Sequence, residues 1–212
     1  MTDLSRFLVG VCGFFFLIVL PLVSYLKRRC LTGKQIFLYF FLCYLLWYLP
    51  YAPIHEGAHF VAGWLTGMQA KSYQLLPRFW KGDFVNGYID WGDGRHWQIL
   101  LSCQAPYLLD GLSVLLGYCL FRKKRNYGPF VGALILTQTY LRAVFDVAVN
   151  YSAGTLAASG DFHYMLGGYN PVAVHTGAWA VMLAGVWGAL REIAKGRPSI
   201  VGAAASAGST LA

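Results

Sequence analysis

The feature that most constrains the fold of this chain is a series of apolar segments, each long enough to cross a lipid bilayer. The first covers residues 7–26, and a helix of about 20 apolar residues crosses a hydrocarbon core of about 30 Å. Hydrophobic residues make up 57% of the chain and charged residues only 12%, which excludes an ordinary soluble domain. The later apolar segments cover residues 35–66, 98–121, 129–149 and 172–190. We therefore expect an all-α membrane protein, a multi-span helical bundle of about five to six transmembrane helices.

Positive charge gathers at one end of these segments. The net charge is +8, and lysines and arginines follow apolar segments at residues 27–34, 122–125 and 191–197. Because basic residues accumulate on the cytoplasmic side of membrane proteins, we expect an integral multi-pass protein with an extracytoplasmic N-terminus. This distribution explains the charge without a nucleic-acid partner, so the expected partner is the lipid bilayer. Residues 50–60 and 150–171 would then share the outer side.

Two prolines interrupt the longest apolar segment. Pro50 and Pro53 lie in its middle, and proline removes a backbone donor and kinks a helix. We expect two helices there, roughly 35–49 and 54–66. The second helix could span the membrane or re-enter among its neighbours.

A mixed polar and aromatic loop covers residues 68–97. The alternation in residues 84–90, with Asn86-Gly87 as a turn signal, predicts a small interfacial β-hairpin or loop. Such a hairpin could anchor the chain at the interface, or its edge could pair with an extended substrate segment. We expect residues 1–198 to form a single integral membrane domain, and the Gly/Ala/Ser-rich residues 199–212 to be a disordered tail.

One motif in the longest segment carries metal chemistry. It reads His55-Glu56-Gly57-Ala58-His59, the His-Glu-x-x-His pattern of zinc hydrolases. Positions four apart share a helix face, so both imidazoles could bind one Zn²⁺ ion, with Glu56 beside the zinc-bound water as general base. Random placement of these residues would produce the pattern in roughly one such sequence per thousand.

Two other interpretations of the histidines remain open at this stage. Paired histidines on a membrane helix can ligate haem, or they can hydrogen-bond to neighbouring helices without any catalytic role.

Catalytic zinc needs a third protein ligand. The candidates that remain after solvated loops and termini are set aside are Asp110, Asp146, Asp161, His163 and His175. Asp146 follows Arg142 by four residues, so a helix-face ion pair is its simpler interpretation. Asp161 follows a flexible glycine and precedes a new helical turn, where it would be either a ligand or a helix cap. We favour Asp161 as the ligand, with Asp146, Asp110 and His163 as alternatives.

The motif and the segments that follow it resemble those of a known family. An apolar helix with His-Glu-x-x-His, followed by a short amphiphilic segment and further spans, is similar to the site-2 protease family of membrane-embedded zinc metalloproteases (peptidase M50-like). The resemblance implies that His55 and His59 bind zinc and that Glu56 is the general base. It also implies a core of three transmembrane helices, the second with a Gly-Pro-x-x-Asn-like stretch and the third with an Asn-led Asp-Gly segment.

The remaining family elements match more loosely. Residues 104–110 read Gln-Ala-Pro-Tyr-Leu-Leu-Asp and resemble the second element. Asn150 and Asp161 resemble the third, which implies a substrate-positioning role for Asn150 and a ligand role for Asp161. Asp161 departs from the family because a glycine precedes it and does not follow it. Residues 109–111, Leu-Asp-Gly, also resemble the family's pattern and keep Asp110 open.

The function expected from these observations is that of an intramembrane zinc metalloprotease. It would hydrolyse a peptide bond of a membrane-protein or peptide substrate in or next to the membrane, with Glu56 activating zinc-bound water. The alternative is a non-enzymatic structural or assembly subunit of a membrane complex, in which the same side chains form an internal hydrogen-bond network.

Overall fold

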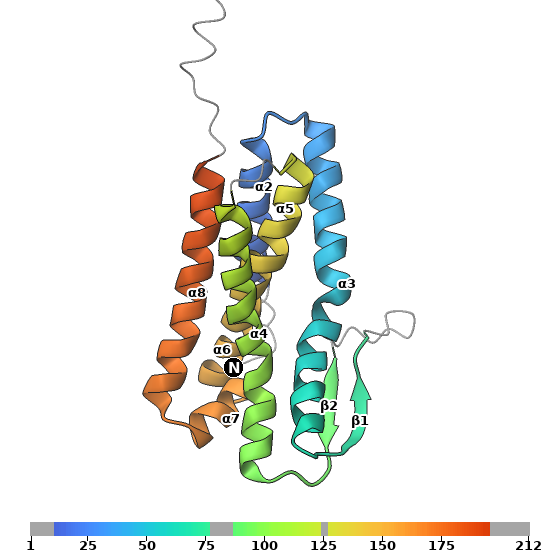
Figure 1. Ribbon diagram of the computed structural model, residues 1–212, viewed down its shortest axis with the longest axis vertical. Coiled ribbons are helices and arrows are strands. Elements are labelled where there is room, and N and C mark those ends of the chain that lie inside the picture. The colour runs from blue at the N-terminus through green and yellow to red at the C-terminus, as the bar shows by residue number, and fades with distance from the viewer. Residues whose placement is uncertain (1–10, 77–86, 124–126, 196–212) are drawn as a thin grey trace, which may run out of the picture.

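The chain folds into an elongated helical bundle with a small sheet against one helix (Figure 1), as described by a computed structural model covering residues 11–76, 87–123 and 127–195. In chain order the elements, with η for a π-helical turn, are η1 (Phe15–Val19), α2 (Leu20–Lys27), α3 (Gly33–Leu65), β1 (Ala70–Gln74), β2 (Tyr88–Trp91), α4 (His96–Arg122), α5 (Pro129–Leu136), η3 (Thr137–Leu141), α6 (Arg142–Leu156), α7 (Asp161–Gly168) and α8 (Pro171–Ala194). The expected tail at residues 199–212 lies outside the described residues.

Among the described residues, four helical segments are long and apolar enough to cross a membrane: α3, α4, the continuous run Pro129–Leu156 that joins α5, η3 and α6, and α8. The shorter apolar helix Val11–Lys27 precedes them and corresponds to the described part of the first predicted segment. The expectation of a mainly helical chain with a small sheet is therefore confirmed for the described residues.

The basic residues of several elements meet at one end of the bundle. The ends of α2, α4 and α8 lie together at the top of Figure 1, beside the first turns of α3 and α5. Nη1 of Arg28 donates a hydrogen bond to the carbonyl of Ile193 at 3.2 Å, and the guanidinium of Arg191 lies over the ring of Tyr118. The sheet and α7 lie toward the opposite end.

Helix α3 runs without a break through Pro50 and Pro53, so the predicted division into two helices was wrong. A proline lacks the amide hydrogen that would bond the carbonyl four residues earlier, which for Pro50 is the carbonyl of Leu46. Nε2 of Gln138, from the π-helical turn η3, donates to that carbonyl at 2.8 Å. A neighbouring side chain thus replaces the missing bond, and the helix continues.

The small sheet differs from the predicted hairpin. β2 pairs antiparallel with β1, with Tyr73 opposite Ile89 and Gln74 opposite Tyr88, so its partner is not the segment across Asn86-Gly87. Residues 77–86, which include Asn86 of the predicted turn, lie outside the described residues. The sheet packs on the lower half of α3 (Figure 1), where the ring of Trp91 fills the space that a side chain at Gly63 would need.

The apolar core has two parts. The larger cluster includes Tyr25, Trp47 and Tyr140 and joins α2, α3 and η3. The smaller cluster includes Tyr107 and Phe162 and joins α4, α6, α7 and α8. The smaller cluster lies directly beside the motif histidines, because the rings of His55 and Tyr107 are 5.8 Å apart between centroids.

Candidate metal centre

The two motif histidines lie side by side in the interior. His55 and His59 are 8% and 7% exposed, and both face the helices that pack against α3. Their Nε2 atoms are 3.2 Å apart. The four-residue spacing places them on one helix face, as the sequence predicts.

Asp161 joins them from a distant part of the chain. It is the first residue of α7 and follows Gly160, which has a φ of +75° that glycine adopts without strain. Its Oδ2 lies 3.2 Å from Nε2 of His59 and 3.6 Å from Nε2 of His55. The turn at Gly160 therefore directs the carboxylate toward the histidines. Asp161, the residue that the sequence favoured as third ligand, is thus the acidic residue that lies close to both Nε2 atoms.

These three side chains form the group of potential ligands found within the described residues. In a tetrahedral zinc site with bonds of about 2.0–2.2 Å, neighbouring ligand atoms are about 3.3–3.6 Å apart. The three observed separations, 3.2, 3.2 and 3.6 Å, match that spacing. Two imidazoles and one carboxylate are typical of zinc and similar transition metals, whereas calcium and magnesium prefer oxygen alone.

The outer nitrogens of both imidazoles are held by acceptors. Nδ1 of His55 lies 2.8 Å from Oδ2 of Asp146, and Nδ1 of His59 lies 2.8 Å from the carbonyl oxygen of Ser102. A carbonyl oxygen has no proton to give, so Nδ1 of His59 must be the donor. In a neutral imidazole with its proton on Nδ1, Nε2 carries a lone pair, and both Nε2 atoms face the centre, which is the arrangement that metal-binding histidines use.

Asp146 is an orienting group and not a ligand in this geometry. Its Oδ1 accepts hydrogen bonds from the hydroxyl of Tyr51 at 2.7 Å and from Nδ2 of Asn150 at 2.8 Å, while its Oδ2 faces His55. Asn150 also donates to the backbone oxygen of Asp146. The substrate-positioning role of Asn150 stays a prediction, since its amide is engaged within α6.

The expected ion pair between Arg142 and Asp146 was wrong. Nη2 of Arg142 lies 3.0 Å from Oδ1 of Asp110 on α4. Both Asp110 and Asp146 are fully buried, but α6 turns its arginine toward α4 and its aspartate toward α3. Asp110 therefore forms an ion pair with Arg142 and does not belong to the group of potential ligands.

His163, the remaining alternative, is exposed on α7 and lines a shallow hollow with His96. It also lies outside the group of ligands. His163 follows Asp161 by two residues, which is about 200° around the helix axis, so the two side chains point in nearly opposite directions and of the two only the aspartate faces the histidines.

Tyr107, Ser102 and Tyr51 are the site residues that sequence reasoning missed. The hydroxyl of Tyr107 donates to Oδ2 of Asp161 at 2.8 Å. No local pattern marks these three residues, because each acts through a contact between helices.

Glu56 lies next to the sheet. It is half-buried, and a Cβ added at Gly87 would come within 2.5 Å of its Cγ. The chain just before β2 therefore passes directly over the side chain of Glu56. Only a glycine permits this approach.

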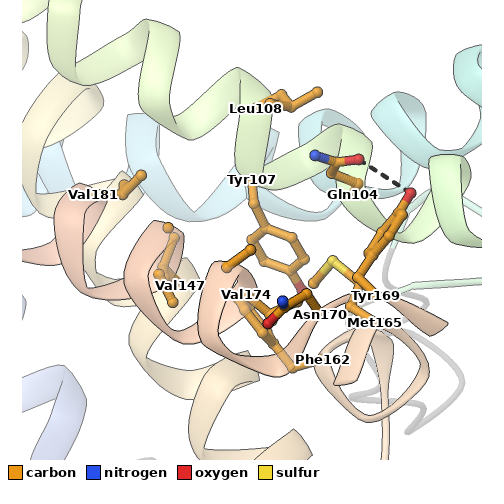
Figure 2. Close-up of a pocket in the computed structure, with 13 residues that line it drawn as sticks. Gln104, Tyr107, Leu108, Val147, Phe162, Met165, Tyr169, Asn170, Val174 and Val181 are labelled. Atoms are coloured by element: carbon orange, nitrogen blue, oxygen red, sulfur yellow. Dashed lines mark hydrogen bonds between the residues drawn. The ribbon is translucent and has the colours of Figure 1, made fainter. Parts of the chain in front are cut away.

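An apolar pocket lies on the other side of Tyr107 (Figure 2). It encloses about 450 Å³ between α4, α6, α7 and α8 and is lined by apolar side chains such as Val174 and Met165. At its mouth the hydroxyl of Tyr169 donates to Oε1 of Gln104 at 3.3 Å, the dashed line in Figure 2. Tyr107 forms part of its wall and separates it from the three ligand candidates.

Two buried histidines and a partly buried aspartate inside an apolar helical bundle form a candidate binding site for zinc or a similar transition metal. Comparison of the chain with known protein families, with curated proteins and with solved structures found no match.

Proposed function

We propose that this protein is an intramembrane zinc metalloprotease, similar to the site-2 protease family. The observation that carries the proposal is the triangle of Nε2 of His55, Nε2 of His59 and Oδ2 of Asp161, with sides of 3.2–3.6 Å. Two lone pairs and a carboxylate that face one another repel unless a cation lies between them. Glu56, adjacent to His55 in the chain, supplies the acid–base group that peptide hydrolysis needs.

Residence in a membrane is part of this proposal. In the described part of the chain, four segments have the length and apolarity of membrane-spanning helices, and large apolar side chains are exposed on the outside, including Phe37 at 71% and Leu65 at 70% exposure. A soluble protein rarely exposes such an extensive apolar surface. His59 precedes the end of α3 by six residues, or about 9 Å along the helix, so the centre would lie below the membrane surface.

Each residue has a defined part in the proposed reaction. Zinc bound to the three side chains would polarise the scissile carbonyl and lower the pKa of a water molecule. Glu56 accepts the proton of the attacking water and then donates it to the leaving amine. The buried His55–Asp146 pair and the His59–Ser102 contact keep both imidazoles in the orientation for binding.

The sheet is the element best placed to hold a substrate. Within the described residues it has two strands, so each strand has one edge without a strand partner. The segment before β2 touches Glu56, and a peptide added to a sheet edge is held in the extended form that a protease requires. The sheet would thereby bring a peptide bond close to the acid–base group. An interfacial anchor is the alternative role of the sheet.

A metal and activity assay tests the proposed function. Protein purified without chelator should contain about one zinc ion per chain, measured by elemental mass spectrometry. His55→Ala should lose the metal, whereas Glu56→Gln should keep it and lose cleavage of a fluorogenic peptide library by at least a hundredfold. If wild-type protein contains no metal, and its zinc content and peptide cleavage equal those of His55→Ala, the non-enzymatic alternative is supported. In that alternative a proton and not a metal lies between the histidines.

A further inference from the structure

We propose that Pro106 is a positioning residue of the metal centre, because it leaves the carbonyl of Ser102 free to orient His59. The inference rests on the proposed metal-binding function and adds a residue to it that the metal itself would not touch. Helix α4 continues through Pro106 without a break from His96 to Arg122.

The helix geometry identifies which carbonyl is released. In an α-helix each N–H bonds the carbonyl four residues earlier, and proline has no N–H. The carbonyl that Pro106 leaves without a helical donor is that of Ser102. A buried carbonyl without a donor is unfavourable, so another group is expected to bond it.

That group is the imidazole of His59. Its Nδ1 lies 2.8 Å from the oxygen of Ser102, and Oγ of Ser102 in turn donates to the backbone oxygen of His59 at 3.1 Å. Ser102 is 1% exposed and Pro106 is fully buried, so water does not compete for this carbonyl. The reciprocal pair of hydrogen bonds joins α3 to α4 at one ligand.

The direction of this hydrogen bond determines the chemistry of His59. Since the carbonyl accepts, a proton resides on Nδ1, and in the neutral imidazole that binds a metal the lone pair of Nε2 then points at His55 and Asp161. An N–H at position 106 would bond the same carbonyl along the helix axis and draw it away from the imidazole. A carbonyl has two lone pairs, so the expected consequence is a weaker and misaligned bond to His59, not its loss.

Pro50 in α3 also leaves a carbonyl without a helical donor, but this carbonyl does not bond a potential metal ligand. Pro50 releases the carbonyl of Leu46, and Nε2 of Gln138 donates to that carbonyl at 2.8 Å. The two prolines therefore have the same backbone effect in neighbouring helices, and both released carbonyls receive a side-chain donor. Only the carbonyl released by Pro106 bonds a potential metal ligand.

The test compares Pro106→Ala with Pro50→Ala in the full-length chain in detergent. Zinc affinity is measured by competition with a chromogenic chelator, and ligand geometry by the visible spectrum of the cobalt-substituted protein. Loss of an outer contact to a metal-bound histidine typically weakens affinity about 10- to 100-fold. We expect about a tenfold loss and an altered cobalt spectrum for Pro106→Ala, with Pro50→Ala within about twofold of wild type.

The outcomes separate this inference from the proposed function. Wild-type affinity and an unchanged cobalt spectrum in Pro106→Ala would overturn the role of Pro106 and leave the metal site standing. Wild-type protein that binds neither metal would overturn both. If Pro106→Ala does not fold, ¹⁵N chemical shifts of labelled histidines in the metal-free wild type decide, since a His59 protonated on Nε2 alone contradicts the inference.

Discussion

At the scale of single residues, three buried or half-buried aspartates have three different roles because each faces a different partner. Asp161 faces the Nε2 atoms of His55 and His59, so it completes the group of potential ligands. Asp146 accepts from the outer nitrogen of His55 and orients it. Asp110 neutralises Arg142, which would otherwise be an unpaired charge in an apolar interior.

These roles predict a graded effect on metal binding. Asp161→Ala removes a ligand and should abolish stoichiometric zinc binding, whereas Asp146→Asn should retain zinc with affinity lowered about 10- to 100-fold, because only an orienting contact weakens. Titration with zinc against a competing chelator measures both. Equal losses in the two variants would show that the assigned roles are wrong.

At the scale of elements, the site depends on where helices and strands touch. α3 supplies two ligand candidates, α7 the third, and α4 the carbonyl that orients His59. The segment just before β2 adds the backbone at Gly87, which lies against Glu56. Helix α3 carries both the histidines and Glu56, but the contacts around them come from different elements, so the proposed metal binding and acid–base chemistry can be separated by substitution.

Gly87→Ala tests that separation. Its new Cβ would lie 2.5 Å from Cγ of Glu56 and 2.9 Å from the backbone oxygen of Gln74, so either Glu56 or the sheet must move. We expect cleavage to fall at least tenfold, because small displacements of a catalytic group are costly, while zinc content stays near that of wild type. Gly57→Ala is the control, since nothing lies within 4 Å of its added Cβ. A similar loss in both variants would contradict the contact-based explanation.

At the scale of the whole molecule, a bound metal would tie together segments that are far apart in the chain. His55 and Asp161 belong to helices that are also joined through Tyr107, whose hydroxyl bonds Asp161. A metal that binds the folded chain stabilises it in proportion to its saturation. Its removal should therefore affect global stability and not only activity.

Chelation should lower the thermal unfolding midpoint of the wild-type protein. At a free zinc concentration about 100 times the dissociation constant, binding contributes about 2.7 kcal/mol, which corresponds to several degrees for a chain of this size. A thermal scan in detergent, with and without chelator, measures the shift. His55→Ala should show no shift, and an equal shift in that variant would mean that the chelator acts elsewhere.

The sequence by itself determined the local features of this protein. Apolar length predicted the long helices, and the four-residue spacing predicted that His55 and His59 share a face, because both depend only on helix geometry. It did not predict that α3 stays continuous at Pro50, since the replacement donor, Gln138, comes from another helix.

Only the tertiary structure decided which acidic residue completes the site and what orients the histidines. Asp110, Asp146 and Asp161 offer the same functional group, and the packing of α4, α6 and α7 against α3 assigns one to Arg142, one to His55 and one to the centre. The physical reason is that a ligand site is a set of distances between atoms, and those distances follow from helix packing and not from neighbouring positions in the chain.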